Sequence, residues 1–137
     1  MMKKRLAYLF ISTLCMLIIC VGCGKNAKNI DVDINGVWES YQIIDVTGTV
    51  HEKGELDMID TFVIEDDHVK YSSSLPSSDE VYEERDYIIE KNKDGTYNFL
   101  MQIQEGSDPL LMEENVKFDD DTMTIEIAGY TFIYKKL

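Results

Sequence analysis

The feature that most constrains the fold of this chain is an alternation of apolar and polar residues with a period of two. In residues 96–104 the apolar side chains on one face of an extended strand are Tyr97, Phe99, Met101 and Ile103. Successive side chains of a β-strand point to opposite faces of its sheet, so the pattern predicts a strand with one buried face. No long stretch after the first 35 residues shows the period of an amphipathic helix.

The alternation predicts further strands at residues 36–44, 47–52, 61–65, 69–73, 110–118, 122–127 and 130–134, and one that begins near Tyr82. Residues 53–60 are predicted to be irregular, with one helical turn. Turn-forming pairs such as Asp94-Gly95 and Ala128-Gly129 separate the strands. The sequence thus predicts an all-β fold, an antiparallel meander of eight or nine strands that closes into an up-and-down barrel. A two-sheet β-sandwich is the alternative, because it also hides the sheet edges.

The first 22 residues differ from the rest of the chain. Lys3, Lys4 and Arg5 precede residues 6–22, which contain no charge. A basic start, an apolar helix and a small residue before a cleavage site are typical of an export signal peptide. An uncleaved membrane helix is the alternative, because an uncharged run of this length is at the lower limit of the ~17–25 residues that span a bilayer.

The motif Cys20-Val21-Gly22-Cys23 resembles the lipobox of bacterial lipoproteins. The resemblance implies that the thiol of Cys23 receives a diacylglyceryl group and that a peptidase then cuts between Gly22 and Cys23. Residues 1–22 would be the signal peptide, residues 23–35 the lipidated cysteine with a polar tether, and residues 36–137 the folded domain. Two acyl chains suffice for stable attachment, so we expect the domain at the extracytoplasmic face of a cell membrane.

The charge of the mature chain limits its partners. Removal of residues 1–22 takes away three basic residues and no acidic one, which leaves 10 basic against 26 acidic residues and a formal charge of −16. Nucleic acid is not an expected partner, because its affinity for proteins comes largely from Lys and Arg. A charged partner would instead be a basic protein, such as one of the cell envelope, or a cation.

Gly36-Val37-Trp38 begins the first predicted strand and resembles the Gly-x-Trp that opens lipocalins and the small lipocalin-like domains of bacterial lipoproteins. Residues 122–135 resemble the last hairpin of such domains. The resemblance implies an eight-stranded barrel in which Trp38, with Gly36 beside it, closes one end. The resemblance bears on the architecture more than on the activity.

Two charged residues fall on predicted apolar faces. Glu114 interrupts the apolar side of residues 110–118, and Arg85 lies on the same side of its strand as Tyr87 and Ile89. A buried charge is costly unless it is paired. One hypothesis is that Arg85 and Glu114 meet inside the barrel or orient a ligand at its mouth. The favoured alternative is a β-bulge that turns Glu114 out to solvent.

Other motifs give little support for chemistry. Asp31-Val32-Asp33-Ile34-Asn35-Gly36 matches the first half of a calcium loop, but position twelve is Gln42 where a bidentate Glu is required. We interpret the segment as a polar lead into the first strand and expect no metal or cofactor. Catalytic motifs for hydrolases, metalloproteases and phosphate binding are absent from the sequence, so we expect no enzyme activity.

These observations leave two functional hypotheses. The first is a non-enzymatic binding lipoprotein whose small lipocalin-like barrel takes up an apolar ligand or contacts a partner at the cell surface. The second is a module with a filled core that binds or inhibits a basic envelope protein through its acidic surface. Whether the barrel contains space for a ligand separates the two.

Overall fold

The computed structural model describes residues 31–78 and 80–137. The predicted signal peptide with its helix, the cleavage site at Gly22 and the lipidation site at Cys23 lie outside these residues. The elements below all belong to one compact unit, Val32–Leu137. In the part of the chain that the structure describes, no helix is long and apolar enough to cross a membrane.

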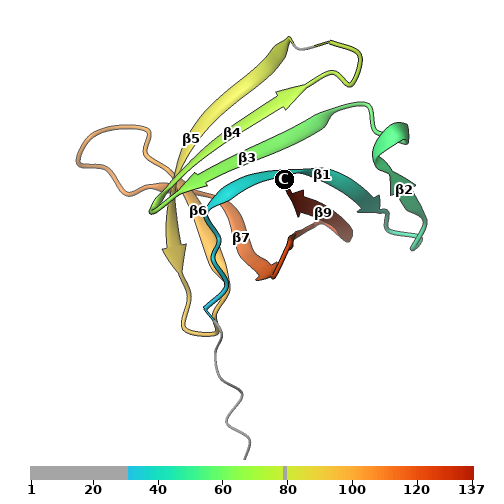
Figure 1. The fold of residues 1–137 in the computed structure, drawn as a ribbon. Helices are drawn as coiled ribbons and strands as arrows, with labels where there is room; N and C mark the ends of the chain where they lie inside the picture. Colours follow the sequence, from blue (N-terminus) through green and yellow to red (C-terminus); the bar gives the residue numbers. More distant parts are fainter. Residues whose placement is uncertain (1–30, 79) are drawn as a thin grey trace, which may run out of the picture. The chain divides into compact units, whose positions relative to one another are not determined.

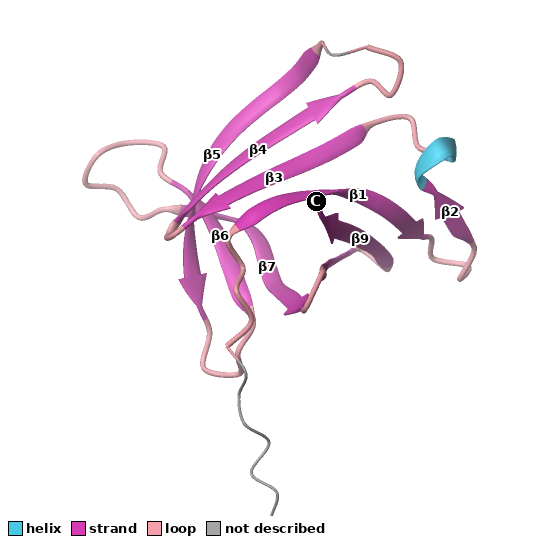
Figure 2. Cartoon of the chain, viewed as in Figure 1, coloured by secondary structure: helices cyan, strands magenta, loops and turns pink. Residues whose placement is uncertain are grey.

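The described chain is almost entirely β-structure, as predicted (Figure 1, Figure 2). Its elements in chain order are β1 (Gly36–Ile44), β2 (Val50–Glu52), the 3₁₀ turn η1 (Lys53–Glu55), β3 (Ile59–Glu65), β4 (His68–Ser74), β5 (Val81–Lys91), β6 (Tyr97–Met101), β7 (Leu110–Asp119), β8 (Thr122–Ile127) and β9 (Tyr130–Lys136).

Two strands are shorter than predicted because side chains stabilise turns in their place. The Asp45 carboxylate accepts hydrogen bonds from the backbone N–H groups of Thr47 and Thr49, at 2.9 and 3.1 Å, so residues 45–49 form a turn and β2 is brief. After β6, the Gln102 amide donates to the carbonyl oxygens of Gln104 and Ser107 and fixes a loop. The prediction that Ile103 faces the core is therefore wrong, and its side chain is 64% exposed.

The strands form one antiparallel sheet that closes on itself. Its order is β2-β1-β3-β4-β5-β6-β7-β8-β9, and β1 also pairs with β9. Eight strands therefore make a closed meander, and β2 is an extra strand on β1. This closure confirms the predicted barrel and excludes the two-sheet sandwich.

The core lies inside this barrel and follows the predicted alternation. Its fully buried large side chains are Trp38, Phe62, Phe99, Ile64, Met123, Ile125, Val69 and Val116. Aromatic rings meet one another across it; the Phe62 ring lies 5.7 Å from that of Phe99 and 5.1 Å from that of Tyr134, measured between centroids. Burial of these large apolar side chains is the main stabilising contribution to the fold.

The two ends of the barrel differ. We call the end with the start of β1, the turns at residues 66–67, 92–96 and 120–121, and the end of β9 the base. The opposite end, with residues 45–58, which include β2 and η1, and the loops at residues 75–78, 102–109 and 128–129, is the mouth. Near the base, neighbouring strands pair all the way round.

Towards the mouth, three of these pairings stop. β1 pairs with β3 only through residues 36–39, β5 with β6 only through residues 88–91, and β7 with β8 only through residues 117–119. Bulges lie in two pairings that continue: β1 changes register against β9 between Ser40 and Gln42, and β7 bulges against β6 at Asn115, whose φ is 54°. The barrel is therefore closed at its base and splayed at its mouth.

Candidate functional site

The base is filled by the tryptophan predicted to close the barrel. Trp38 is 0% exposed, and its indole N–H donates to the Ile34 carbonyl oxygen at 2.9 Å. Its ring meets that of Phe118 edge-on at 5.1 Å between centroids, and the Lys136 ammonium lies 5.4 Å from its centre. These contacts fill the base, which leaves the mouth as the end where a ligand could enter.

Gly36 lies at the base where two strands approach closely. Its φ is +134°, and a Cβ atom there would lie 2.7 Å from Cε of Lys136. The Lys136 ammonium donates to the backbone oxygen of Asp33 at 2.8 Å. Glycine at this position lets the start of β1 and the Lys136 side chain come together.

The proposed pairing of Glu114 with Arg85 is not what the structure contains. The bulge at Asn115 turns Glu114 out to solvent, as the alternative interpretation predicted. Glu114 lines a groove on the outer surface with Asp94, Thr96, Asn115, Lys117 and Glu126. Its neighbour Glu113 lies opposite the buried Phe99 and takes the inward place.

Asp60 is the centre of a hydrogen-bonded group inside the mouth. Its carboxylate accepts from the Tyr71 hydroxyl at 3.1 Å and from the Ser73 hydroxyl at 2.7 Å. The Ser40 hydroxyl accepts from the Asp60 N–H at 2.8 Å and donates to its carbonyl oxygen at 3.3 Å. Asp60 is in phase with Phe62, so a carboxylate stands directly above the aromatic core.

Arg85 brings the only described cation of this interior group. Its guanidinium pairs with Glu83 on the same strand. Its interactions with Tyr87 and Glu83 raise the pKa of the guanidinium, which stays charged at any ordinary pH. The side chain is still 37% exposed, so Arg85 remains accessible from the mouth.

Glu113 is the titratable group of the site. Burial raises the pKa of Glu113 to about 7, and the negative charge of Asp60 adds to the rise while Arg85 opposes it. A carboxyl group with such a pKa exists in both forms near neutral pH, so it can donate or accept a hydrogen bond.

Three tyrosines separate these charges from the apolar core. Burial is the main cause that raises the pKa values of Tyr71, Tyr87 and Tyr134, so their hydroxyl groups stay protonated. The ring of Tyr87 stacks between those of Tyr71 and Phe99, at 6.1 and 6.3 Å between centroids. The site therefore has an aromatic floor with hydroxyl groups.

A pocket opens where β1 and β3 part. Past Ser40 and Asp60 the two strands no longer pair, and β1 pairs there with β2 through residues 42–44, with η1 directly after β2. The pocket has a volume of about 350 Å³. Its lining combines four apolar side chains with acidic, hydroxyl and imidazole groups: Ile43, Leu56, Met58, Phe132, Ser40, His51, Glu55, Asp57 and Asp60.

His51 is held at the edge of this pocket by the β1–β2 turn. Its Nε2 lies 2.9 Å from an oxygen of Asp45. The pKa of Asp45 is held well below its usual value, mainly by hydrogen bonds from Thr47 and His51. The turn thus stabilises the position of His51 at the edge of the pocket. The sequence predicted this residue only as part of a strand.

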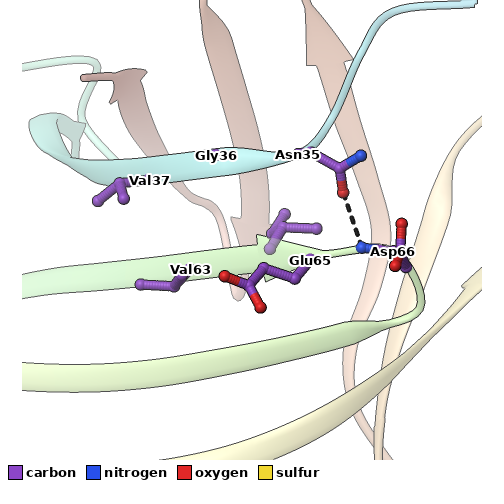
Figure 3. Close-up of a pocket in the computed structure, with 7 residues that line it drawn as sticks. Asn35, Gly36, Val37, Val63, Glu65 and Asp66 are labelled. Atoms are coloured by element: carbon purple, nitrogen blue, oxygen red, sulfur yellow. Dashed lines mark hydrogen bonds between the residues drawn. The ribbon is translucent and has the colours of Figure 1, made fainter.

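A second hollow lies on the outside of the barrel at its base (Figure 3). It has a volume of about 400 Å³ and opens beside the β1–β3 ladder, where the Asn35 side-chain oxygen accepts from the Asp66 N–H at 2.8 Å. Its lining combines Val37, Val63 and Ile64 with Asn35, Gly36, Glu65 and Asp66. It lacks the combination of groups found at the mouth.

The segment that resembles half a calcium loop is occupied by local contacts. The Asp33 carboxylate accepts from the Asn35 N–H at 3.1 Å, and the Lys136 ammonium lies 4.0 Å from its other oxygen. Among residues 31–78 and 80–137, no group of three or more acidic, His or Cys side chains is placed to hold a metal ion.

The chain matches no family model, no curated protein and no solved structure.

Sequence reasoning identified Arg85 but missed Asp60 and Glu113. Asp60 fell in the segment predicted to be irregular, although it is in phase with Phe62 and Ile64 once β3 is extended to Ile59. A regular strand with Met112, Val116 and Phe118 on its inner face would put Glu113 on the outer face, and the bulge reverses this.

Proposed function

We propose that this protein is a non-enzymatic, lipid-anchored binding protein of the extracytoplasmic face of the membrane, which takes up a small, largely apolar ligand at the mouth of its barrel. The pocket of about 350 Å³ between β1 and β3 is the observation that supports this most directly. Its volume falls in the range of ~300–1,000 Å³ that is usual for small-molecule sites.

The lining indicates the chemistry of the ligand. Ile43, Leu56, Met58 and Phe132 provide apolar contact, whereas the nearby polar groups are mostly acidic. Carboxylates accept hydrogen bonds and attract positive charge, so a ligand with an apolar body and an amine or hydroxyl head fits best. An anionic head would meet Asp57 and Asp60.

The anchor is the second part of the proposal. Residues 32–35 join β1 at the base, so the tether meets the domain at the end opposite the mouth. With lipid on Cys23, the mouth stays open to solvent. We expect the mature wild-type chain to begin at Cys23 and to carry the diacylglyceryl mass, and Cys23→Ser to abolish both the lipid and the cleavage, because the peptidase acts only after the lipid is attached. A wild-type chain without lipid and with its uncleaved mass would favour a retained membrane helix instead.

The ligand class can be tested by competition on residues 24–137. The fluorescent apolar probe N-phenyl-1-naphthylamine is bound first, and octylamine or octanoate is then added. We expect octylamine to displace the probe at a lower concentration than octanoate, because only the amine is attracted by the acidic lining. Asp60→Asn, which keeps a hydrogen-bond acceptor, should reduce this preference, whereas Asp86→Asn on the outer face should leave it unchanged.

Two outcomes would contradict the proposed site. Failure of the probe to bind would show that the pocket does not take up apolar molecules. Equal displacement by octylamine and octanoate, with no effect of Asp60→Asn, would show that the interior carboxylates do not select the ligand.

A second candidate function is the docking of a basic envelope protein. The formal charge of −16 of the mature chain favours it. Attraction between exposed charges is screened by salt, so such binding should weaken steeply between low and physiological ionic strength. This function can coexist with ligand uptake, because it uses the outside of the barrel.

A further inference from the structure

The first half of β5 is a sheet edge without a strand beside it. Residues 81–88 pair with β4, but only residues 88–91 pair with β6 on the other side. Among the described residues, no backbone hydrogen bond outside the ladders involves residues 81–87. In Figure 1 this half of β5 runs along the upper margin of the sheet.

An edge of this kind presents a row of backbone donors and acceptors to an extended chain. Proteins commonly protect such edges with charged side chains, or use them to bind a peptide that adds a strand to the sheet. The free half of β5 is long enough for either purpose, and Tyr82 on it is 78% exposed. Its side chains decide which chains could pair with it.

Those side chains are mainly acidic. Glu83, Glu84 and Asp86 lie on the free half of β5, against one cation, Arg85. If a second copy of this chain paired here, its Glu84 and Asp86 would lie near the same acidic residues of the first copy. Like charges that face each other across two strands are unfavourable. A strand with basic residues would form opposite-charge pairs instead.

The outer face of the edge gives the pattern of such a strand. Along the free half, the exposed Tyr82 is followed at alternate positions by Glu84 and Asp86, whereas the next residue of this row, Ile88, already pairs with Leu100 of β6. Cross-strand pairs are favourable between aromatic or β-branched residues and between opposite charges. The matching strand therefore has, at alternate positions, an apolar residue and two basic residues.

We propose that the free edge of β5 binds an extended, basic segment of another extracytoplasmic protein by strand addition. This deepens the second candidate function by giving the docking place and the form of the partner, and it does not depend on ligand uptake at the mouth. Backbone hydrogen bonds supply affinity, and the row of Tyr82, Glu84 and Asp86 supplies selectivity.

The test uses the full-length protein in a non-denaturing detergent and the peptide acetyl-Thr-Val-Thr-Lys-Thr-Lys-Thr-Val-Thr-amide. Binding is followed by hydrogen exchange, resolved along β5. We expect those amides of residues 81–87 that point away from β4 to exchange at least about tenfold more slowly when the peptide is saturating, because newly paired amides are protected. Residues 89–91, which already pair with β6, should change little.

Two controls separate strand addition from general attraction between charges. The same peptide, N-methylated at its central three residues, keeps its side chains but loses backbone donors, and it should not protect β5. The variant Glu84→Gln/Asp86→Asn should raise Kd about fivefold or more. The matched variant Glu65→Gln/Glu90→Gln, which removes the same charge from paired strands near the base, should leave Kd nearly unchanged.

Two results would overturn the proposal. Equal binding of the N-methylated peptide, or equal weakening by both double variants, would show that the acidic surface attracts the peptide without strand addition. In that case the second candidate function would stand without this docking place. Absence of any peptide binding at low salt would contradict both the strand addition and the second candidate function.

Discussion

The Ser40 hydroxyl forms two hydrogen bonds with the backbone of Asp60: it accepts from the N–H at 2.8 Å and donates to the carbonyl oxygen at 3.3 Å. These bonds stand where the backbone ladder between β1 and β3 has just ended. The Ser40 side chain thus satisfies the backbone N–H and carbonyl oxygen of Asp60, which no longer has a backbone partner on β1. The parting of the strands beyond it forms the pocket at the mouth.

Removal of this hydroxyl should destabilise the barrel. In Ser40→Ala the Asp60 N–H loses its acceptor in a site where Ser40 is only 8% exposed. A buried donor left without a partner costs ~1–3 kcal/mol. We expect the free energy of unfolding in urea to fall by about this amount. Ser72→Ala, on the outward-facing side of β4, is the control and should change it by less than ~0.5 kcal/mol. Equal effects would contradict the role given to Ser40.

The stability of the protein should fall as the pH rises towards neutrality, because of Glu113. Its pKa is raised from 4.5 to about 7 in the folded protein, so the folded state binds the proton more tightly than the unfolded state. Between pH 4.5 and 7, ionisation of Glu113 therefore destabilises the fold. The full shift corresponds to ~3 kcal/mol, and partial solvent access reduces this to about 1–2 kcal/mol.

The variant Glu113→Gln tests this pH dependence. It should be about as stable as the wild type at pH 5 and more stable at pH 8, in urea unfolding experiments at both values. Glu114→Gln is the matched control on the outer face and should preserve the wild-type pH dependence. If Glu113→Gln keeps the wild-type slope, the carboxyl group does not titrate inside the barrel.

Arg85 should influence the titration of Glu113 across the mouth. Its positive charge lowers the pKa of Glu113, in opposition to burial and Asp60. In Arg85→Gln we expect the pKa of Glu113, followed by NMR of its side-chain carbonyl carbon, to rise above about 7. Lys70→Gln, which removes a cation paired with Glu84 on the outer face, should leave the pKa of Glu113 unchanged. A lower pKa in Arg85→Gln would contradict the proximity of the two groups.

Gly36 should be required for its backbone conformation. Its φ of +134° is unfavourable for other residues, and such strain costs ~1–3 kcal/mol. Gly36→Ala should lower the free energy of unfolding by this amount, whereas Gly54→Ala, with nothing within 4 Å of the added Cβ and no positive φ, should be nearly neutral. The double variant Gly36→Ala/Lys136→Ala removes the contact at 2.7 Å between the added Cβ atom and Cε of Lys136. Full recovery of the free energy of unfolding in this variant would show that the loss in Gly36→Ala comes from this contact and not from the strained φ.

The sequence predicted the all-β architecture because the alternation of residues such as Phe99 and Met101 survives in the folded barrel. It predicted the position of β1 and β8 to the residue. Their boundaries coincide with abrupt changes of pattern at Gly36 and Ala128. The strand pairs that end early could not be predicted, since alternation says which face is buried but not where a neighbour separates.

The candidate site was predicted only in part for the same reason. Arg85 was found because a regular strand put it on the apolar face, and β5 is regular there. Glu113 and Glu114 exchanged faces because one extra residue at Asn115 shifts the alternation. Which residue of a strand forms a bulge depends on its partners across the sheet, and that information is not local.

Native mass spectrometry of residues 24–137, compared with denaturing mass spectrometry of the same sample, tests the central claim most directly. We predict a reproducible adduct of one small molecule that is lost on denaturation, is retained in Glu65→Gln/Glu90→Gln, and is reduced when Met58→Trp fills the pocket. A bare mass in every preparation, together with no uptake of octylamine, would contradict a ligand-binding mouth. The barrel would then be a module with a filled core.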